Sequence, residues 1–151
     1  KGTIKIGATT ITYDREAEEE NFTDFSTILP ENILEMKNQF LGKISQIPPI
    51  FSAKKVKGKP LYLYARRNQE VEIKPAEVEV LKFDITEINL PFIDFEIVCS
   101  KGTYIRSIAN DLGEKLGTGA YLHSLRRTAI GSVSVANALT IQEFQELFVQ
   151  I

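Results

Sequence analysis

The sequence predicts an α+β domain in which a mixed or antiparallel sheet is flanked by helices. Three observations support this fold class. Strand-like and helix-like stretches follow one another in an irregular order, which is typical of α+β domains and unlike the regular alternation of a doubly wound sheet. The chain has 151 residues, of which 43% are hydrophobic, enough for one domain core or part of one. No internal repeat or low-complexity linker divides it.

Strand patterns occupy four regions. Residues 2–8 alternate between apolar and other residues and predict a first strand. Residues 71–88 predict either a pair of strands or one long bent strand, with Pro75 at an edge or a break. Residues 92–99 alternate apolar and acidic positions and predict a further strand. Residues 129–135 indicate a last, short strand.

Helical spacing appears in three other regions. Residues 30–40 predict a helix that turns Ile33, Leu34 and Phe40 inward and begins at or near a proline. Residues 103–116 predict a second helix, with Thr103 as its cap and a glycine directly after its end. Thr140 to Glu143 have capping-box spacing ahead of an apolar helical pattern at Phe144, Leu147 and Phe148.

Composition and charge exclude several classes of function. Cys99 is the only cysteine and His123 the only histidine, so the chain holds no disulfide framework, no cysteine-based zinc site and no histidine-rich catalytic centre. No apolar run is long enough to span a bilayer. The net charge of −2 predicts no general affinity for polyanions, so binding of nucleic acid would require a local basic patch.

The junction between residues 92–99 and the helix after them carries two cations. Lys101 lies just before the helix and Arg106 lies in its first turn. The amino end of a helix carries a positive dipole, so an exposed cation there costs roughly 0.3–1 kcal/mol. An anion facing this end, either a carboxylate or a phosphate, would explain both cations. The alternative is two solvated charges on a surface turn.

A hydroxyl-rich segment follows the first predicted strand. Residues 7–14 contain three threonines and a tyrosine and end in the carboxylate of Asp14. Small polar residues at the end of a strand suit a binding loop, although threonine-rich strands are also common. The acidic run at 16–20 is expected to be a solvated, mobile loop.

The most basic segment lies between Phe51 and Asn68. It contains six cations and no acidic residue, with Phe51, Tyr62 and Tyr64 interleaved. In an acidic protein, such a segment suits a surface that contacts phosphates and bases. The alternative is an amphipathic helix that buries its tyrosines and leaves its lysines in water. The predicted RNA contacts are Lys54, Lys55, Lys57, Lys59, Arg66 and Arg67, together with Lys101.

Three segments together resemble the TruB family of tRNA pseudouridine synthases. They are Gly7-Ala8-Thr9-Thr10-Ile11-Thr12-Tyr13-Asp14, the segment 46–62 with the sequence QIPPIFSAKKVKGKPLY, and Cys99-Ser100-Lys101-Gly102-Thr103-Tyr104-Ile105-Arg106. The tail at 116–128, LGTGAYLHSLRRT, also matches. The matches are long, follow the family's order and extend over nearly the whole chain.

The resemblance implies that residues 1–151 form the C-terminal portion of a pseudouridine synthase catalytic domain, with a basic thumb at about 48–68. The family converts a uridine in the T loop of tRNA, uridine 55, to pseudouridine without a cofactor. The base is detached from its ribose, turned and rejoined through carbon, after the uridine has been flipped out of the RNA. The implied partner is the T stem-loop of tRNA, and the implied location is the cytoplasm.

The resemblance also assigns roles to individual residues. Arg106 matches the arginine that pairs with the catalytic aspartate and would hold that carboxylate charged and oriented. Tyr104 would line the uridine pocket and Leu125 would form part of its apolar wall. Asp14 matches a polar residue near the flipped nucleotide. The spacing of Leu122 and Leu125 independently predicts that both side chains pack inward.

The chain departs from the family's pattern at its beginning. The catalytic aspartate of the family lies in a Gly-x-Leu-Asp motif, which does not occur here. We therefore expect a fragment that begins in mid-domain, is inactive alone and needs the missing N-terminal half of the catalytic domain as a partner. Tyr121 stands where many relatives carry histidine, and the acidic run replaces a glycine usually found after the threonine-rich segment.

Two other interpretations compete with the enzyme fragment. The first is a non-catalytic RNA-binding module that uses the basic segment. It predicts salt-sensitive binding of tRNA that is lost on charge reversal at Lys55, Lys57 and Arg67. The second is a scaffold domain that binds no RNA, which a flat binding titration would favour.

Overall fold

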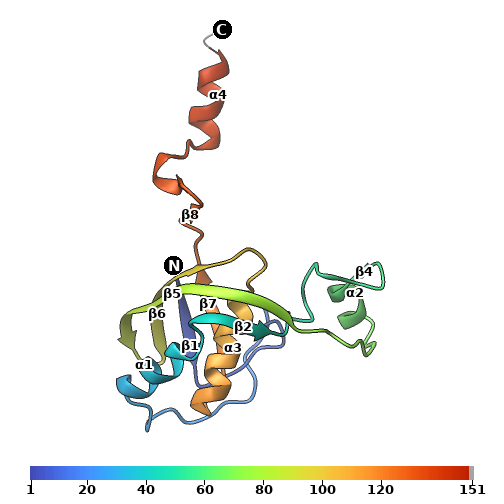
Figure 1. Ribbon diagram of the computed structural model, residues 1–151, viewed down its shortest axis with the longest axis vertical. Coiled ribbons are helices and arrows are strands. Elements are labelled where there is room, and N and C mark those ends of the chain that lie inside the picture. The colour runs from blue at the N-terminus through green and yellow to red at the C-terminus, as the bar shows by residue number, and fades with distance from the viewer. Residues whose placement is uncertain (150–151) are drawn as a thin grey trace.

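Five strands form the central sheet of the computed structural model, which describes the backbone of residues 1–149 and side-chain surroundings through residue 147 (Figure 1). Every neighbouring pair of strands is antiparallel, which confirms the predicted α+β class. The strand order is β2 (Gly42–Gln46), β5 (Ala76–Asn89), β6 (Phe92–Cys99), β1 (Gly2–Ile6) and β7 (Ala120–Leu125).

Helices α1 (Pro30–Asn38) and α3 (Ile105–Leu116) pack against each other and cover one face of this sheet. The alternating apolar residues of the strands meet the apolar faces of both helices, because strand side chains alternate between faces and helical ones recur every three or four residues. The rings of Phe83 and Phe95 meet edge to face at 5.8 Å in this core. Its most buried members include Ile4, Ile6, Ile33, Ile93, Ile108 and Leu112.

The other face of the sheet is polar. Thr3 on β1 donates a hydrogen bond of 2.6 Å to Asp94 on the neighbouring strand β6. Lys82 on β5 pairs with Asp84 at 3.0 Å and with Glu96 of β6 at 3.6 Å. The two cross-strand contacts, of Thr3 with Asp94 and of Lys82 with Glu96, explain why β6 alternates apolar and acidic residues: one set faces the helices and the other set faces away from them.

The start of α3 differs from the prediction by one residue. Tyr104, not Thr103, is the N-cap, and the hydroxyl of Thr103 donates instead to the carbonyl of Ser100 at 2.9 Å. The N-cap residue is held by Gln46 of β2, which is only 2% exposed. Its amide accepts from the Tyr104 N–H at 2.8 Å and donates to the Tyr104 carbonyl at 3.0 Å. The helix ends at Gly117, as predicted, with a left-handed φ of 71°.

Three side-chain expectations are wrong. Leu34 on α1 is 42% exposed because Ile33, its neighbour, takes the buried position. Leu125 is 52% exposed at the end of β7, whereas Leu122 is buried as predicted. Glu19, in the acidic run, is not a free solvated side chain, because it accepts hydrogen bonds from Lys5 and Tyr121.

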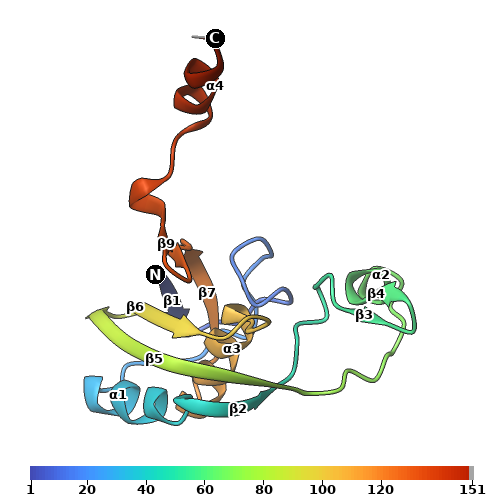
Figure 2. The same cartoon turned by 45° about the horizontal axis from the view of Figure 1, so that its top comes forward.

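Two appendages leave the sheet domain, as Figure 2 shows. The first carries most of the basic segment 51–68. It consists of a hairpin, β3 (Lys55–Val56) and β4 (Lys59–Pro60), and the short helix α2 (Leu61–Ala65). The second follows β7 and contains a hairpin, β8 (Ala129–Ile130) and β9 (Val133–Ser134), a 3-10 turn (Val135–Asn137) and helix α4 (Ile141–Val149).

Helix α4 begins with the predicted capping box, while the side chain of Phe148, also part of the predicted apolar pattern, lies outside the described residues. Thr140 donates its backbone N–H to Glu143 at 2.7 Å, and Glu143 returns its N–H to the Thr140 hydroxyl at 3.2 Å. No helix in the described part of the chain combines the length and apolarity needed to cross a bilayer.

Candidate functional site

The turn between β6 and α3 is fixed by hydrogen bonds to a neighbouring strand. Ser100 donates its N–H to the carbonyl of Glu79 on β5 at 2.8 Å, and its hydroxyl accepts the Glu79 N–H at 2.9 Å. Gly102 has a φ of 83°, which a side chain would disfavour, and reverses the chain toward the helix. Together with the Gln46 clamp on Tyr104, these bonds determine where the first turn of α3 places its side chains.

Arg106 joins three segments that are far apart in the sequence. Its Nη1 donates to the carboxylate of Asp14 at 3.1 Å and to the carbonyl of Thr12 at 3.0 Å. Its Nη2 donates to the carbonyl of Phe51 at 3.0 Å. The side chains of Arg106 and Asp14 are 24% and 17% exposed. The anion expected near Arg106 is thus, among the described residues, the carboxylate of Asp14.

The two cations of this turn therefore have different surroundings. Arg106 is mostly buried and paired, so the interpretation as a solvated surface charge is wrong for this residue. Lys101 is exposed, and in the described part of the chain it has no ion-pair partner, which agrees with a solvated charge.

Asp14 is held by its own loop as well as by Arg106. Its Oδ1 accepts the hydroxyl of Thr12 at 2.7 Å and the N–H of Glu16 at 3.1 Å, while its Oδ2 faces Arg106. Thr10 donates its hydroxyl to the Asp14 carbonyl at 2.6 Å. The hydroxyl-rich segment is thus a loop that orients one carboxylate. Tyr13, with a left-handed φ of 63°, makes the turn.

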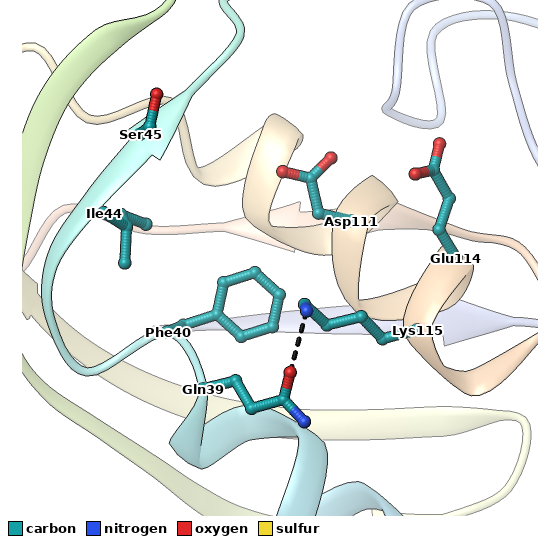
Figure 3. Close-up of a pocket in the computed structure, with 7 residues that line it drawn as sticks. All are labelled: Gln39, Phe40, Ile44, Ser45, Asp111, Glu114 and Lys115. Carbon is teal, nitrogen blue, oxygen red and sulfur yellow. Dashed lines mark hydrogen bonds between the residues drawn. The ribbon is translucent and has the colours of Figure 1, made fainter.

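The phenol of Tyr13 lies toward acidic residues of α3. Its pKa is raised by burial, and further by the negative charges of Glu114 and Asp111. Burial likewise raises the pKa of Asp111 above that of an exposed aspartate. These acids line a groove of about 480 Å³ between the end of α1, β2 and α3, in which Lys115 donates to Gln39 at 2.8 Å (Figure 3).

A second, smaller hollow shares Phe51 with the Arg106 site. It has a volume of about 230 Å³ and lies between the threonine loop, through Ile11, and the base of the first appendage, through Ile50 and Phe51. The Phe51 carbonyl that accepts from Arg106 belongs to this wall. Residues 65 and 68–70 complete the lining. The hollow is mostly apolar and lies at the base of the basic segment.

The basic segment exposes nearly all of its cations. Lys55 and Lys59 lie on the hairpin, Arg66 and Arg67 follow α2, and all four are exposed. Lys57 is also exposed, and Lys54 is half-buried with its ammonium 3.4 Å from the carbonyl of residue 74. Within the described residues, no carboxylate is close enough to form an ion pair with any of the six.

The aromatic residues of this segment are only partly buried. Leu61 is the buried residue of α2, while Tyr62 and Tyr64 are intermediate, so the interpretation as a helix with tyrosines in the core is wrong. Tyr64 donates its hydroxyl to the carbonyl of Val56 and so fastens α2 to the hairpin. The Arg66 guanidinium stacks 5.5 Å from the ring centre of Tyr62.

The structure brings some of the predicted site residues together and not others. Tyr104 lies directly ahead of the helical turn that carries Arg106, and Asp14 is in contact with Arg106. Leu125 is three residues beyond Leu122, the residue of β7 that donates to Tyr13. The described residues contain no group of three histidine, cysteine, aspartate or glutamate side chains placed to hold a metal ion.

Sequence reasoning missed two features of the site. The sequence does not indicate the hydrogen bonds of Gln46 to Tyr104, because a single glutamine at the end of a short polar strand has no distinctive pattern. The ion pair between Asp14 and Arg106 joins residues 92 positions apart, and each had been noted separately.

The fold has counterparts among solved structures. A chain described as "Crystal Structure of a Cbf5-Nop10-Gar1 Complex" has a TM-score of 0.68 over 97% of this chain and 34% of its own, at 21% identity. Another, "Structure of H/ACA RNP bound to a substrate RNA containing 2'-deoxyuridine", has a TM-score of 0.55 over 89% and 28%, at 19% identity. At these identities the likeness concerns the fold alone.

Sequence comparison identifies the family. Residues 1–105 match the family model described as TruB family pseudouridylate synthase (N terminal domain), and residues 106–150 match the tRNA pseudouridylate synthase B C-terminal domain. The chain therefore belongs to the TruB family of pseudouridine synthases, which confirms the resemblance found in its motifs.

Curated relatives carry the same family assignment. Proteins named tRNA pseudouridine synthase B are 49% identical in Chloroherpeton thalassium, over 99% of this chain and 62% of the relative, and 42% identical in Clostridium tetani, over 97% and 51%. The relative in Flavobacterium johnsoniae is 48% identical over 96% and 63%. The chain thus spans between half and two thirds of the length of these relatives.

Proposed function

We propose that this chain is the C-terminal portion of the catalytic domain of a tRNA pseudouridine synthase that acts on uridine 55 in the T loop, in the cytoplasm. In this reaction the N1–C1′ bond of the uridine breaks and a C5–C1′ bond forms. The C5 proton leaves the base and N1 takes up a proton, so no cofactor or net redox change is needed. Family membership and the buried Arg106 carry the proposal.

Arg106 acts by positioning a carboxylate. A guanidinium has five N–H donors in a rigid fork, and its bonds to Asp14, Thr12 and Phe51 use three of them. The others can hold a second carboxylate, the catalytic aspartate, which the proposal places in a segment outside this chain. Because Asp14 and the loop carbonyl fix the guanidinium, the second carboxylate would be held charged and at one orientation.

The remaining residues of the site bind the flipped nucleotide and the RNA. Tyr104 precedes Arg106 at the opening of α3 and would line the uridine pocket, with Leu125 on its apolar side. Asp14, at the end of the threonine-rich loop and bonded to Arg106, would lie near the flipped nucleotide. The exposed, unpaired cations of the basic segment and Lys101 would neutralise phosphates of the T stem-loop, and the half-buried tyrosines would offer stacking surfaces to bases.

A direct experiment measures release of tritium from tRNA labelled at C5 of uridine. The full-length protein that contains this chain is expected to release tritium, and the 151-residue chain alone is expected to release none. Adding the upstream part of the domain to the chain should restore release. Activity of the isolated chain would contradict the assignment of the catalytic aspartate to a separate segment.

A non-catalytic RNA-binding module is the second candidate. It is favoured because the cations of the basic segment form no ion pairs among the described residues, and because the chain has no Gly-x-Leu-Asp motif. This candidate predicts salt-sensitive binding of tRNA by the full-length protein without any tritium release. The two outcomes of the same assay therefore separate the candidates.

A further inference from the structure

The acidic loop after Asp14 is anchored on the polar face of the sheet. Glu19 Oε1 accepts the hydroxyl of Tyr121 at 2.5 Å and also pairs with the ammonium of Lys5. Lys5 on β1 and Tyr121 on β7 are paired across the two strands, so their side chains share one face of the sheet. Tyr121 is only 4% exposed although it lies on the face away from the helices.

The same loop is also fixed at its base and at the free edge of β7. Thr9 and Glu20 exchange two backbone hydrogen bonds of 2.8 and 2.9 Å, which close a loop that contains Asp14. The carbonyl of Tyr13 accepts the N–H of Leu122 at 2.9 Å. Strand β7 is the last strand of the sheet, so this N–H lies at its free edge, where Asp14 and Leu122 form a parallel bridge. The loop is therefore held at the edge of β7 by Leu122 and on the polar face of the sheet by Tyr121.

From this arrangement we propose that Glu19, Lys5 and Tyr121 are positioning residues: they hold the loop around β7 and so keep Asp14 in place against Arg106. The proposal rests on the proposed function, because the arginine site matters for activity only if the protein forms pseudouridine. None of the three residues touches Arg106, so each would act through the loop.

The chemistry of the three groups suits a permanent anchor. Hydrogen bonds from Lys5 and then from Tyr121 lower the pKa of Glu19, so the carboxylate is charged at neutral pH and accepts both donors. Burial, and then the bond to Glu19, raise the pKa of Tyr121, so its phenol keeps the proton that it donates. The protonation of Glu19 and Tyr121, and with it their hydrogen bond, therefore does not change near neutral pH.

Loss of the anchor should affect the rate more than the binding of RNA. Asp14 and Arg106 must be within hydrogen-bond distance for the site to be organised, and a displacement of about 1 Å at such a site can lower a rate by about a hundredfold. The basic segment that would bind the RNA is a separate appendage and makes no contact with Glu19 in the part of the chain that the structure describes.

The test uses the full-length protein with the variants Tyr121→Phe, Glu19→Ala and the double variant. Glu96→Gln is the matched control, since Glu96 makes ion pairs on the same face of the sheet, with Lys1 and Lys82, and has none to the loop. Single-turnover pseudouridine formation gives the rate and a titration gives the Kd for tRNA. Amide hydrogen exchange at Leu122 reports directly on the contact between the loop and β7.

We expect Tyr121→Phe and Glu19→Ala each to lower the single-turnover rate by about tenfold, with the Kd for tRNA changed by less than about twofold. The double variant should be no slower than the slower single variant, because both remove one contact. Exchange at Leu122 should be faster in both variants and unchanged in Glu96→Gln.

Equal losses of rate and affinity, or rates unchanged from the wild type, would overturn the inference. If the wild-type protein forms no pseudouridine, the proposed function fails by itself. In that case the exchange at Leu122 still decides the inference: unchanged exchange in both variants refutes the anchoring role, and faster exchange supports it.

Discussion

Replacing Arg106 by glutamine should lower the free energy of unfolding by about 2–4 kcal/mol. The substitution removes a charge-assisted bond to Asp14 and two bonds to backbone carbonyls, of Thr12 and Phe51. A bond that involves a charged group contributes about 1.5–3 kcal/mol, and breaking a fully buried ion pair costs about 3–5 kcal/mol. The side chains here are 24% and 17% exposed, which lowers the expected cost.

A double-mutant cycle isolates the ion pair from the other bonds of Arg106. The free energies of unfolding of Arg106→Gln, Asp14→Asn and the double variant, measured by urea denaturation of the full-length protein, should show a coupling energy of about 1–2 kcal/mol. Lys101→Gln is the control, because this exposed cation lies in the same turn and should change stability by less than about 0.5 kcal/mol. A coupling energy near zero, or an equal effect of the control, would refute the reasoning.

Three further predictions concern RNA binding, packing and pH. Charge reversal at exposed Lys55 and Arg67 should weaken tRNA binding, measured by titration at several salt concentrations. The slope of the logarithm of the binding constant against the logarithm of the salt concentration should become shallower by about 0.7–0.9 per lost phosphate contact. Reversal of Lys43, an exposed lysine of β2, should leave this slope unchanged. Gly113→Ala should destabilise the fold by about 1–3 kcal/mol in urea denaturation, because a Cβ there would lie 2.2 Å from a backbone nitrogen of β7; a wild-type-like midpoint would contradict this packing. Asp111→Asn should raise the free energy of unfolding at pH 7, because burial raises the pKa of Asp111 in the folded state above its unfolded value of 3.8. The folded state binds this proton more tightly than the unfolded state, so the charged carboxylate destabilises the fold fully at pH values above the raised pKa. The stability gained by the variant should therefore vanish in melting curves recorded below pH 3.8.

The framework of the fold could be predicted because its elements have strong periodicity. Strand β1 alternates over five residues, and α3 repeats its apolar residues at helical spacing up to a glycine stop. Strand β2 was missed because its five residues, Gly42–Gln46, include a single large apolar residue and lie between stronger signals. Its partner β5 is one long strand, and periodicity alone could not distinguish it from two.

Tertiary contacts decided the features that periodicity could not predict. Thr103 has the right chemistry for an N-cap, but Gln46 from a neighbouring strand supplies the bonds one residue later. The acidic run has the composition of a solvated loop, yet Glu19 meets two donors on the sheet. Leu125 follows the spacing of an inward residue, but β7 ends there and no element of the described chain covers it.

The candidate site was predicted in its residues more fully than in its geometry. Arg106 was identified from charge at a helix start, and the basic segment from composition, since both signals are local. The partner of Arg106 was expected outside this chain, and the structure shows Asp14 in contact with it. Such a contact depends on how a distant loop folds around β7, which the sequence pattern does not encode.

The central claim is that Arg106 holds a catalytic carboxylate so that the full protein can convert uridine to pseudouridine. The most direct measurement is the single-turnover release of tritium from C5-labelled tRNA by the full-length wild type and by Arg106→Lys, which keeps the charge but loses the fork of donors. We expect release by the wild type and a rate at least about a hundredfold lower for Arg106→Lys, with a similar Kd for tRNA. Equal rates for the two proteins, or no release by the wild type, would contradict the claim.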